Sequence, residues 1–305
     1  MGEAEIEGAV ALARRPMWKQ VVDFPLVTMV FAFTIVLLFA GLVSGLAEIA
    51  LRQTDIPRQS LITAVIAAAA MVLIYKTVIA RLGEQPRDDL SGPGALRQTV
   101  GGLAIGFALF SVIVGAAALL GVYQVGGTGD ASFLFVALIA DGLFPAVSEE
   151  LLFRGILFRW LEELGGSWAA LLISSALFGF SHWWNPNATL VSSVGISLEA
   201  GLLLGGAYML TRKLWVPMGL HAAWNITQGE IYGIPVSGKP VHGLIQSRLQ
   251  GPEILTGGGF GLEASLIAIV IATAFGVYLI VRAARAGEIV RPWWVRRRLA
   301  LASGD

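Results

Sequence analysis

The sequence is dominated by long apolar segments separated by short polar connections, and these segments constrain the fold more than any other feature. Segments at about residues 26–47 and 100–122 are long enough, at about 1.5 Å per residue, to cross a hydrocarbon core of roughly 30 Å. Only 14% of the residues are charged and 56% are hydrophobic. Because a backbone in lipid must satisfy its own hydrogen bonds, the sequence predicts an all-α, polytopic membrane protein.

We predict about eight transmembrane helices forming a single transmembrane domain at residues 26–284. The fourth helix is expected to bend near Pro145, and Gly126–Asp130 is expected to form a tight turn before it. An interfacial lead-in, residues 1–25, precedes the domain, and a basic tail, residues 285–305, follows it. A Gly- and Pro-rich outer loop spans about residues 229–261. The predicted helices cover about residues 26–47, 61–75, 100–122, 133–159, 168–182, 190–210, 215–227 and 264–281.

The distribution of Lys and Arg among the connections predicts the orientation. With the N-terminus inside, 17 of the 21 Lys and Arg residues fall on the cytoplasmic side. The four on the other side are Arg52, Arg58, Lys239 and Arg248. Cytoplasmic loops carry an excess of positive charge. We therefore expect an integral protein of a bacterial cytoplasmic membrane with both termini in the cytoplasm.

Composition excludes several classes of function. The chain has no cysteine, so disulfides, thiolate metal sites and a cysteine nucleophile are excluded. The net charge is zero, and no basic surface for nucleic acid is expected. The expected partners are membrane lipid and a membrane-associated protein or peptide substrate.

Residues 148–155 place two adjacent carboxylates and a guanidinium inside an apolar segment. Charged groups at membrane depth are costly unless they pair or face a polar cavity, and they commonly mark function. In a helix, Glu150 and Arg154 lie on one face at i and i+4, whereas Glu149 has no local partner. We interpret Glu150 as held ionised by Arg154 and Glu149 as free to move protons. The alternative is a structural ion pair that fixes two helices.

Two of the three histidines, His182 and His221, lie in predicted spans. Each is expected to lie close to another polar residue, either at the same depth in the membrane or on the same helix face. Glu149 and His182 are equally far from the predicted turn at residues 165–166, so an antiparallel hairpin would place them at the same depth. His221 and Asn225 lie at i and i+4. Each histidine alone is more simply explained as an interhelical hydrogen-bond partner, but together with the Glu pair they predict a buried polar cluster.

Three further polar residues have no patterned partner in the sequence. Asp141 is interpreted as a polar-pocket or capping residue, Glu199 as a supporting acid, and His242 as a solvated residue of the outer loop.

The three motifs Glu149-Glu150-x-x-x-Arg154, Phe178-x-x-x-His182 and His221-x-x-x-Asn225 resemble those of the CPBP family of intramembrane proteases. This group contains CAAX prenyl protease type 2 and bacteriocin-processing or self-immunity proteins. The resemblance covers about residues 131–230, the expected catalytic core, and extends more loosely to residues 236–238 and 256–263.

The resemblance implies an intramembrane endopeptidase, and it implies a role for each motif residue. Glu149 would activate water with help from His182, His221 and Asn225 would complete the site, and Glu150 with Arg154 would support it. Desolvation makes a carboxylate a better base, and a preorganised Asn or His donor can stabilise an oxyanion.

The residues leave the question of a metal open. Glu149, His182 and His221 could form a zinc first shell with a fourth position for water. The sequence lacks the His-Glu-x-x-His spacing that would itself indicate zinc, and Glu149 with His182 could polarise water directly.

Two other functions are compatible with the same residues. A non-catalytic immunity or scaffold protein would use the polar cluster only for helix packing. A proton-coupled transporter would use Asp141, Glu199 and the Glu pair as a relay, but the sequence shows no inverted half that would support it.

Overall fold

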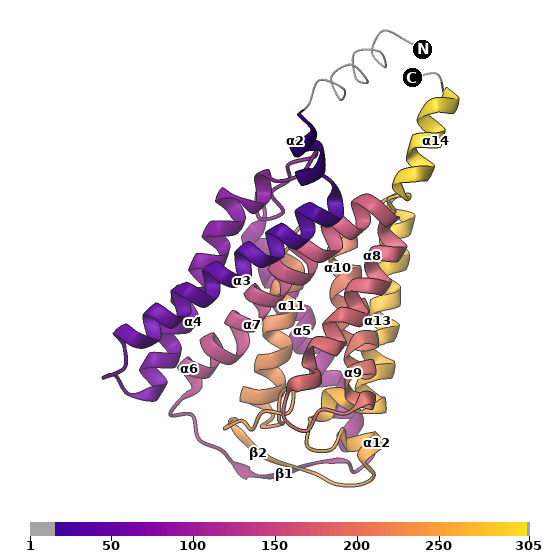
Figure 1. Ribbon diagram of the computed structural model, residues 1–305. Coiled ribbons are helices and arrows are strands. Elements are labelled where there is room, and N and C mark those ends of the chain that lie inside the picture. Colours follow the sequence, from indigo (N-terminus) through magenta and orange to yellow (C-terminus); the bar gives the residue numbers. More distant parts are fainter. Residues whose placement is uncertain (1–15, 304–305) are drawn as a thin grey trace.

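The computed structural model describes residues 16–303 and confirms the all-α class. The predicted lead-in at residues 1–25 therefore lies partly outside the described residues. Most helices run along one common direction, with α2 and α14 at one end of the bundle and a small β-sheet at the other (Figure 1).

The helices before the fourth predicted span are α2 (Met17–Val22), α3 (Pro25–Ala50), α4 (Ile56–Thr77), the 3₁₀ turn η1 (Ile79–Arg81) and α5 (Ala95–Leu119). The central helices are α6 (Leu134–Ala137), η2 (Leu138–Leu143), α7 (Phe144–Glu150), η3 (Leu151–Phe158), α8 (Arg159–Ser181), η4 (His182–Trp184), α9 (Leu190–Ile196), η5 (Ser197–Gly201), α10 (Leu202–Thr211), α11 (Trp215–Ile226) and η6 (Thr227–Ile231). The last are α12 (Glu253–Thr256), η7 (Leu262–Ala264), α13 (Leu266–Arg285) and α14 (Trp293–Ser303).

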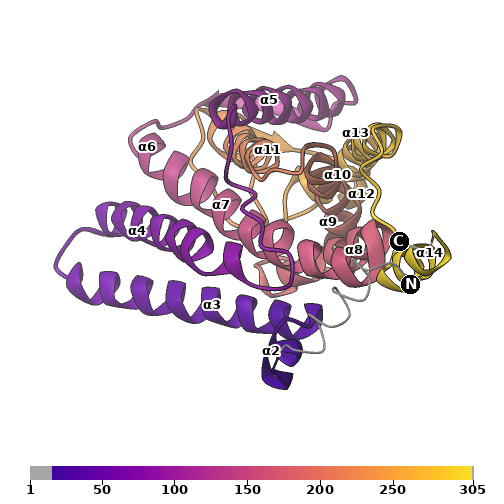
Figure 2. The same cartoon turned by 90° about the horizontal axis from the view of Figure 1, so that it is seen from above.

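Helical structure occupies all eight predicted spans. Within the described residues, five helices are long and apolar enough to cross a membrane by themselves. They are Pro25–Ala50, Ile56–Arg81, Ala95–Leu119, Leu190–Thr211 and Leu266–Arg285. The other three predicted spans carry the polar motifs. Seen along the bundle, α3 and α4 lie on one side, α5 on the other, and α7, α10 and α11 between them (Figure 2).

The fourth span is a continuous run of alternating helix types rather than one α-helix. The π-helical segments η2 and η3 lie on either side of α7. Pro145 has no N–H and cannot donate to the preceding turn, so the irregularity expected near this residue takes the form of the π-helix η2. Such segments are frequent at functional sites.

The chain reverses direction inside α8, at Gly166. This glycine has φ 78° and ψ 172°, a left-handed conformation that side chains disfavour. A Cβ at this position would also crowd the carbonyl oxygen of Val290. The second half of α8 returns along η3, where Phe153 and Phe178 pack edge to face with ring centroids 5.0 Å apart.

The predicted turn at Gly126–Asp130 is wrong for its first part, because residues 123–128 form a β-strand. Strand β1 (Tyr123–Thr128) pairs antiparallel with β2 (Ile245–Leu249) from the outer loop. The pairing joins segments more than a hundred residues apart, so no local turn signal reveals it. The sheet ties the outer loop to the end of α5.

Helix α11, which carries the third motif, packs closely on α5 through glycines of both helices. A Cβ at Gly102 would collide with the carbonyl oxygen of Val216, one at Gly106 with that of Leu220, and one at Gly219 with that of Thr99. Small residues allow this close approach between helices in lipid. The contact fixes the position of His221 at the site.

We expect Gly106→Val to push α11 away from α5 and to lower the free energy of unfolding by about 1–3 kcal/mol, the usual cost of overpacking. Gly101→Val is the matched control, because a Cβ at Gly101 meets nothing within 4 Å. The measurement is the thermal stability of both purified variants in detergent. Equal melting temperatures would contradict the close contact.

Candidate active site

Three motif side chains converge at one point from three helical segments. The carboxylate oxygen Oε2 of Glu149 lies 3.9 Å from Nε2 of His182 and 3.9 Å from Nε2 of His221. These residues line a cavity of about 300 Å³. Glu149 Oε2 is shielded from solvent and has no hydrogen-bond partner among the described residues. The site therefore combines a free carboxylate with two imidazoles.

The other ring nitrogen of each histidine is held by a specific acceptor. Nδ1 of His182 lies 2.8 Å from the carbonyl oxygen of Phe178, and Nδ1 of His221 lies 3.0 Å from Oε1 of Glu150. A carbonyl only accepts, so Nδ1 of His182 carries the proton. Both rings therefore direct Nε2 toward Glu149.

Glu150 and Arg154 form an ion pair whose side chains have no exposed surface. Nη1 of Arg154 donates to Oε1 of Glu150 at 2.8 Å. Nη2 donates to the carbonyl oxygen of Gly201 at 3.3 Å, and the guanidinium lies 4.6 Å from the ring centroid of Phe178. The pair therefore links the first motif to the second motif and to η5, while Glu150 also holds His221.

Asn225 occupies the rim of the cavity, and its contact follows from the proline in the fourth span. Its Nδ2 donates to the carbonyl oxygen of Asp141 at 3.3 Å. In a regular α-helix this oxygen would accept from the residue four positions later, which is Pro145 and has no N–H. Asp141 is exposed and lines the same cavity. This hydrogen bond connects the third motif, on α11, with the irregular fourth span that carries the first motif.

The outer loop contributes residues that the motif analysis did not assign to the site. Val236 and Lys239 pair across a two-residue turn, Ser237-Gly238, with φ 49° and 79°. Val236, Ser237 and Lys239 line the cavity. The backbone N–H of Ser237 donates to the carboxylate of Glu263. The looser resemblance at residues 236–238 and 256–263 was the only sequence signal for this turn.

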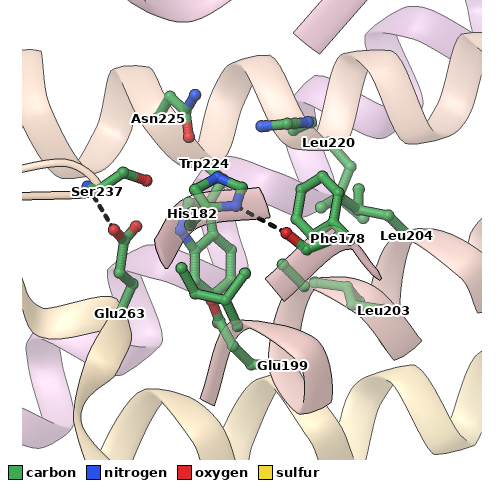
Figure 3. Close-up of a pocket in the computed structure, with 13 residues that line it drawn as sticks. Phe178, His182, Glu199, Leu203, Leu204, Leu220, Trp224, Asn225, Ser237 and Glu263 are labelled. Atoms are coloured by element: carbon green, nitrogen blue, oxygen red, sulfur yellow. Dashed lines mark hydrogen bonds between the residues drawn. The ribbon is translucent and has the colours of Figure 1, made fainter. Parts of the chain in front are cut away.

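Behind the imidazoles lies a second, smaller cavity of about 30 Å³, shown in Figure 3. Glu199 and Glu263 line it together with His182, His221 and Asn225. Glu199 is 1% exposed, and its Oε2 has no hydrogen-bond partner among the described residues. The sequence analysis interpreted Glu199 as a supporting acid, and the residue does lie beside the two histidines. His242 is exposed on the outer loop and lines neither cavity.

The residues proposed for zinc do not form a metal shell in this arrangement. Among residues 16–303, no group of three or more His, Asp or Glu side chains is placed to hold a metal ion. Zinc bonds of about 2.0–2.1 Å in a tetrahedral shell put ligand atoms roughly 3.3 Å apart, whereas Glu149 lies 3.9 Å from each imidazole nitrogen. Zinc binding by Glu149, His182 and His221 stays a prediction.

Comparison with known proteins identifies the region that contains the site. Residues 131–227 match the family model described as type II CAAX prenyl endopeptidase Rce1-like. "Putative membrane peptidase YdiL" of Bacillus subtilis (strain 168) is 25% identical over 123 residues, which are 40% of this chain and 46% of that protein. The chain thus aligns with less than half the length of this curated relative. No solved structure matches the chain.

Glu263 makes the stability of the cavity wall depend on pH. Burial raises the pKa of Glu263 to about 7 from 4.5, although hydrogen bonds from Ser237, Trp224 and Gln228 oppose the rise. A carboxyl with a raised pKa stabilises the fold when protonated. The contribution of Glu263 to the free energy of unfolding is therefore complete below pH 4.5, the pKa in the unfolded chain, and is lost as the pH rises through about 7, the pKa in the folded protein;.

We therefore expect the wild type to lose stability relative to Glu263→Gln between pH 5 and 8, by on the order of 3 kcal/mol for a shift of this size. Gln keeps the shape and does not titrate. Thermal unfolding of both proteins across this pH range measures the difference. A stability difference that does not change with pH would contradict the raised pKa.

Proposed function

We propose that this chain is an intramembrane endopeptidase of the CPBP family that acts on a membrane-associated protein or peptide, and the match of residues 131–227 to the Rce1-like family model supports this. The observation that supports the proposal most strongly is the geometry around Glu149. Its Oε2 is buried, lacks a hydrogen-bond partner, and faces two imidazole nitrogens at 3.9 Å. A water molecule between these groups would have acceptors for both of its protons.

In the proposed reaction, Glu149 is the general base. It removes a proton from the water as the oxygen adds to the carbonyl carbon of the scissile peptide bond. The carbonyl oxygen of the resulting tetrahedral intermediate is negatively charged. Protonated Glu149 then gives its proton to the departing amide nitrogen, and the C–N bond breaks. The products are a carboxylic acid and an amine, which exchange a proton to become a carboxylate and an ammonium group. General acid–base catalysis of this kind contributes about 10²–10⁴-fold.

The two histidines have different surroundings, and we assign them different roles. His182 is a neutral acceptor at Nε2, because its Nδ1 proton is used on the carbonyl of Phe178. It helps to orient and polarise the water. His221 contacts Glu150, whose negative charge stabilises an imidazolium;. Its Nε2 would then donate to the oxyanion.

Asn225 would add a second donor to the oxyanion. One of its amide hydrogens is used on Asp141, and the residue lines the cavity. Preorganised donors of this kind are worth on the order of 10²-fold in rate each. Glu150 and Arg154 do not touch the water in this scheme and act by positioning His221 and Phe178.

The central test is Glu149→Gln in purified protein with a membrane-peptide substrate. We expect hydrolysis to fall by at least about 10²-fold, because Gln cannot accept the proton, while the melting temperature stays close to wild type. Glu253→Gln is the control, since Glu253 is exposed and lies outside both cavities. Retained hydrolysis in Glu149→Gln would refute the mechanism. An unchanged cellular phenotype with lowered stability would instead favour a non-catalytic scaffold.

We propose direct activation of water by Glu149 rather than by a zinc ion, because of the spacing of the three side chains. The expected result is that the rate of the purified peptidase is unchanged after treatment with a chelator and that the metal content is well below one per chain. Loss of activity that is restored by added zinc would overturn this assignment and would make Glu149, His182 and His221 the first residues to test as ligands.

A further inference from the structure

The catalytic cavity lies toward the end of the bundle that carries the outer loop, whose residues Val236, Ser237 and Lys239 line it. His182 begins η4, directly after the last residue of α8. Trp183 and Trp184 follow it and are 47% and 83% exposed. Tryptophans of this kind gather at the membrane interface. The site is therefore close to an interface, at the end of the bundle that carries β1 and β2 (Figure 1).

Positive charge is concentrated at the opposite end. Among the described residues, the end with β1 and β2 carries Arg52, Arg58, Lys239 and Arg248. The other end, with α2 and α14, carries Lys19, Lys76, Arg81, Arg87, Arg97, Arg159, Arg212, Lys213, Arg282, Arg285, Arg291, Arg296, Arg297 and Arg298. The positive-inside rule places the more basic end in the cytoplasm. The end with the cavity then faces away from the cytoplasm.

A second groove lies beside the catalytic cavity, between α3, α4 and η2. Its volume is about 320 Å³, and it shares Ala140 and Phe144 with the catalytic cavity. Its other lining residues include Ser44 and Glu48 near the end of α3 and Gln59 near the start of α4. A groove with these polar groups suits a peptide backbone better than an acyl chain.

We propose that the catalytic cavity opens on the non-cytoplasmic side of the membrane. Its substrate is then an extended segment of a membrane-anchored polypeptide, cleaved close to the outer surface of the bilayer. The substrate assignment rests on the proposed peptidase function, whereas the direction of the opening does not.

The absence of cysteine from the chain allows a direct test, because each introduced cysteine is the only thiol. Ala131→Cys and Lys239→Cys place an exposed thiol at the cavity end, and Ala286→Cys places one at the opposite end. The full-length variants are expressed in bacterial cells, and spheroplasts are treated with a membrane-impermeant maleimide before and after permeabilisation.

We expect Ala131→Cys and Lys239→Cys to be labelled in intact spheroplasts and Ala286→Cys only after permeabilisation. The reverse pattern, or equal labelling of both ends, would overturn the proposed orientation. Labelling does not require catalysis, so this result is independent of whether the protein is a peptidase.

The second measurement maps peptide termini in membranes from cells with the wild type and with Glu149→Gln. Cleavage sites that depend on Glu149 are expected within non-cytoplasmic segments next to a transmembrane helix. Sites on the cytoplasmic side would overturn the substrate assignment. Correct labelling without any Glu149-dependent cleavage would refute the peptidase function and, with it, the substrate assignment, and would leave the orientation standing.

Discussion

The structure depends on the burial of one ion pair, Glu150 with Arg154, inside an apolar bundle. Neither side chain has exposed surface, so each charge is tolerable only because the other, and additional polar groups, are present. Those additional groups are the ring of His221 and the backbone carbonyls of η5. The requirement to satisfy two buried charges therefore brings three motifs and a fourth helical segment to one place.

Irregular backbone does the remaining positioning. The π-helices η2 and η3 lie on either side of α7, and η3 contains Arg154 of the first motif. A third π-helix, η5, presents the carbonyl groups that accept from Arg154. Pro145 leaves the Asp141 carbonyl without its usual helical partner, and Asn225 donates to it;. Backbone carbonyl groups of irregular helix thus accept hydrogen bonds from two motif side chains, Arg154 and Asn225.

The two glutamates of the first motif divide structure and chemistry between them. Glu150 is fully buried, and its Oε1 is held by Arg154 and His221. Glu149 is 29% exposed at its side chain, and its Oε2 faces the two imidazoles of the cavity. This difference gives one residue the properties of a base and the other those of a support. The wall of the cavity facing the outer loop is set by Glu263 through the turn at Ser237, so the loop belongs to the site as well as covering it.

The sequence by itself determined the helical membrane class, the approximate positions of the helical segments and the closeness of Glu149 to His182, because apolar length, helical period and distance from a turn are local properties. It also separated Glu150 from Glu149, since the i to i+4 relation with Arg154 is local. The tertiary structure decided that Glu150 holds His221, that Asn225 binds Asp141, and that Ser237, Lys239 and Glu263 form the cavity wall. The tertiary structure also decided the pairing of β1 with β2. These contacts join segments far apart in the chain, and packing of whole helices and loops, which no local pattern encodes, selects them.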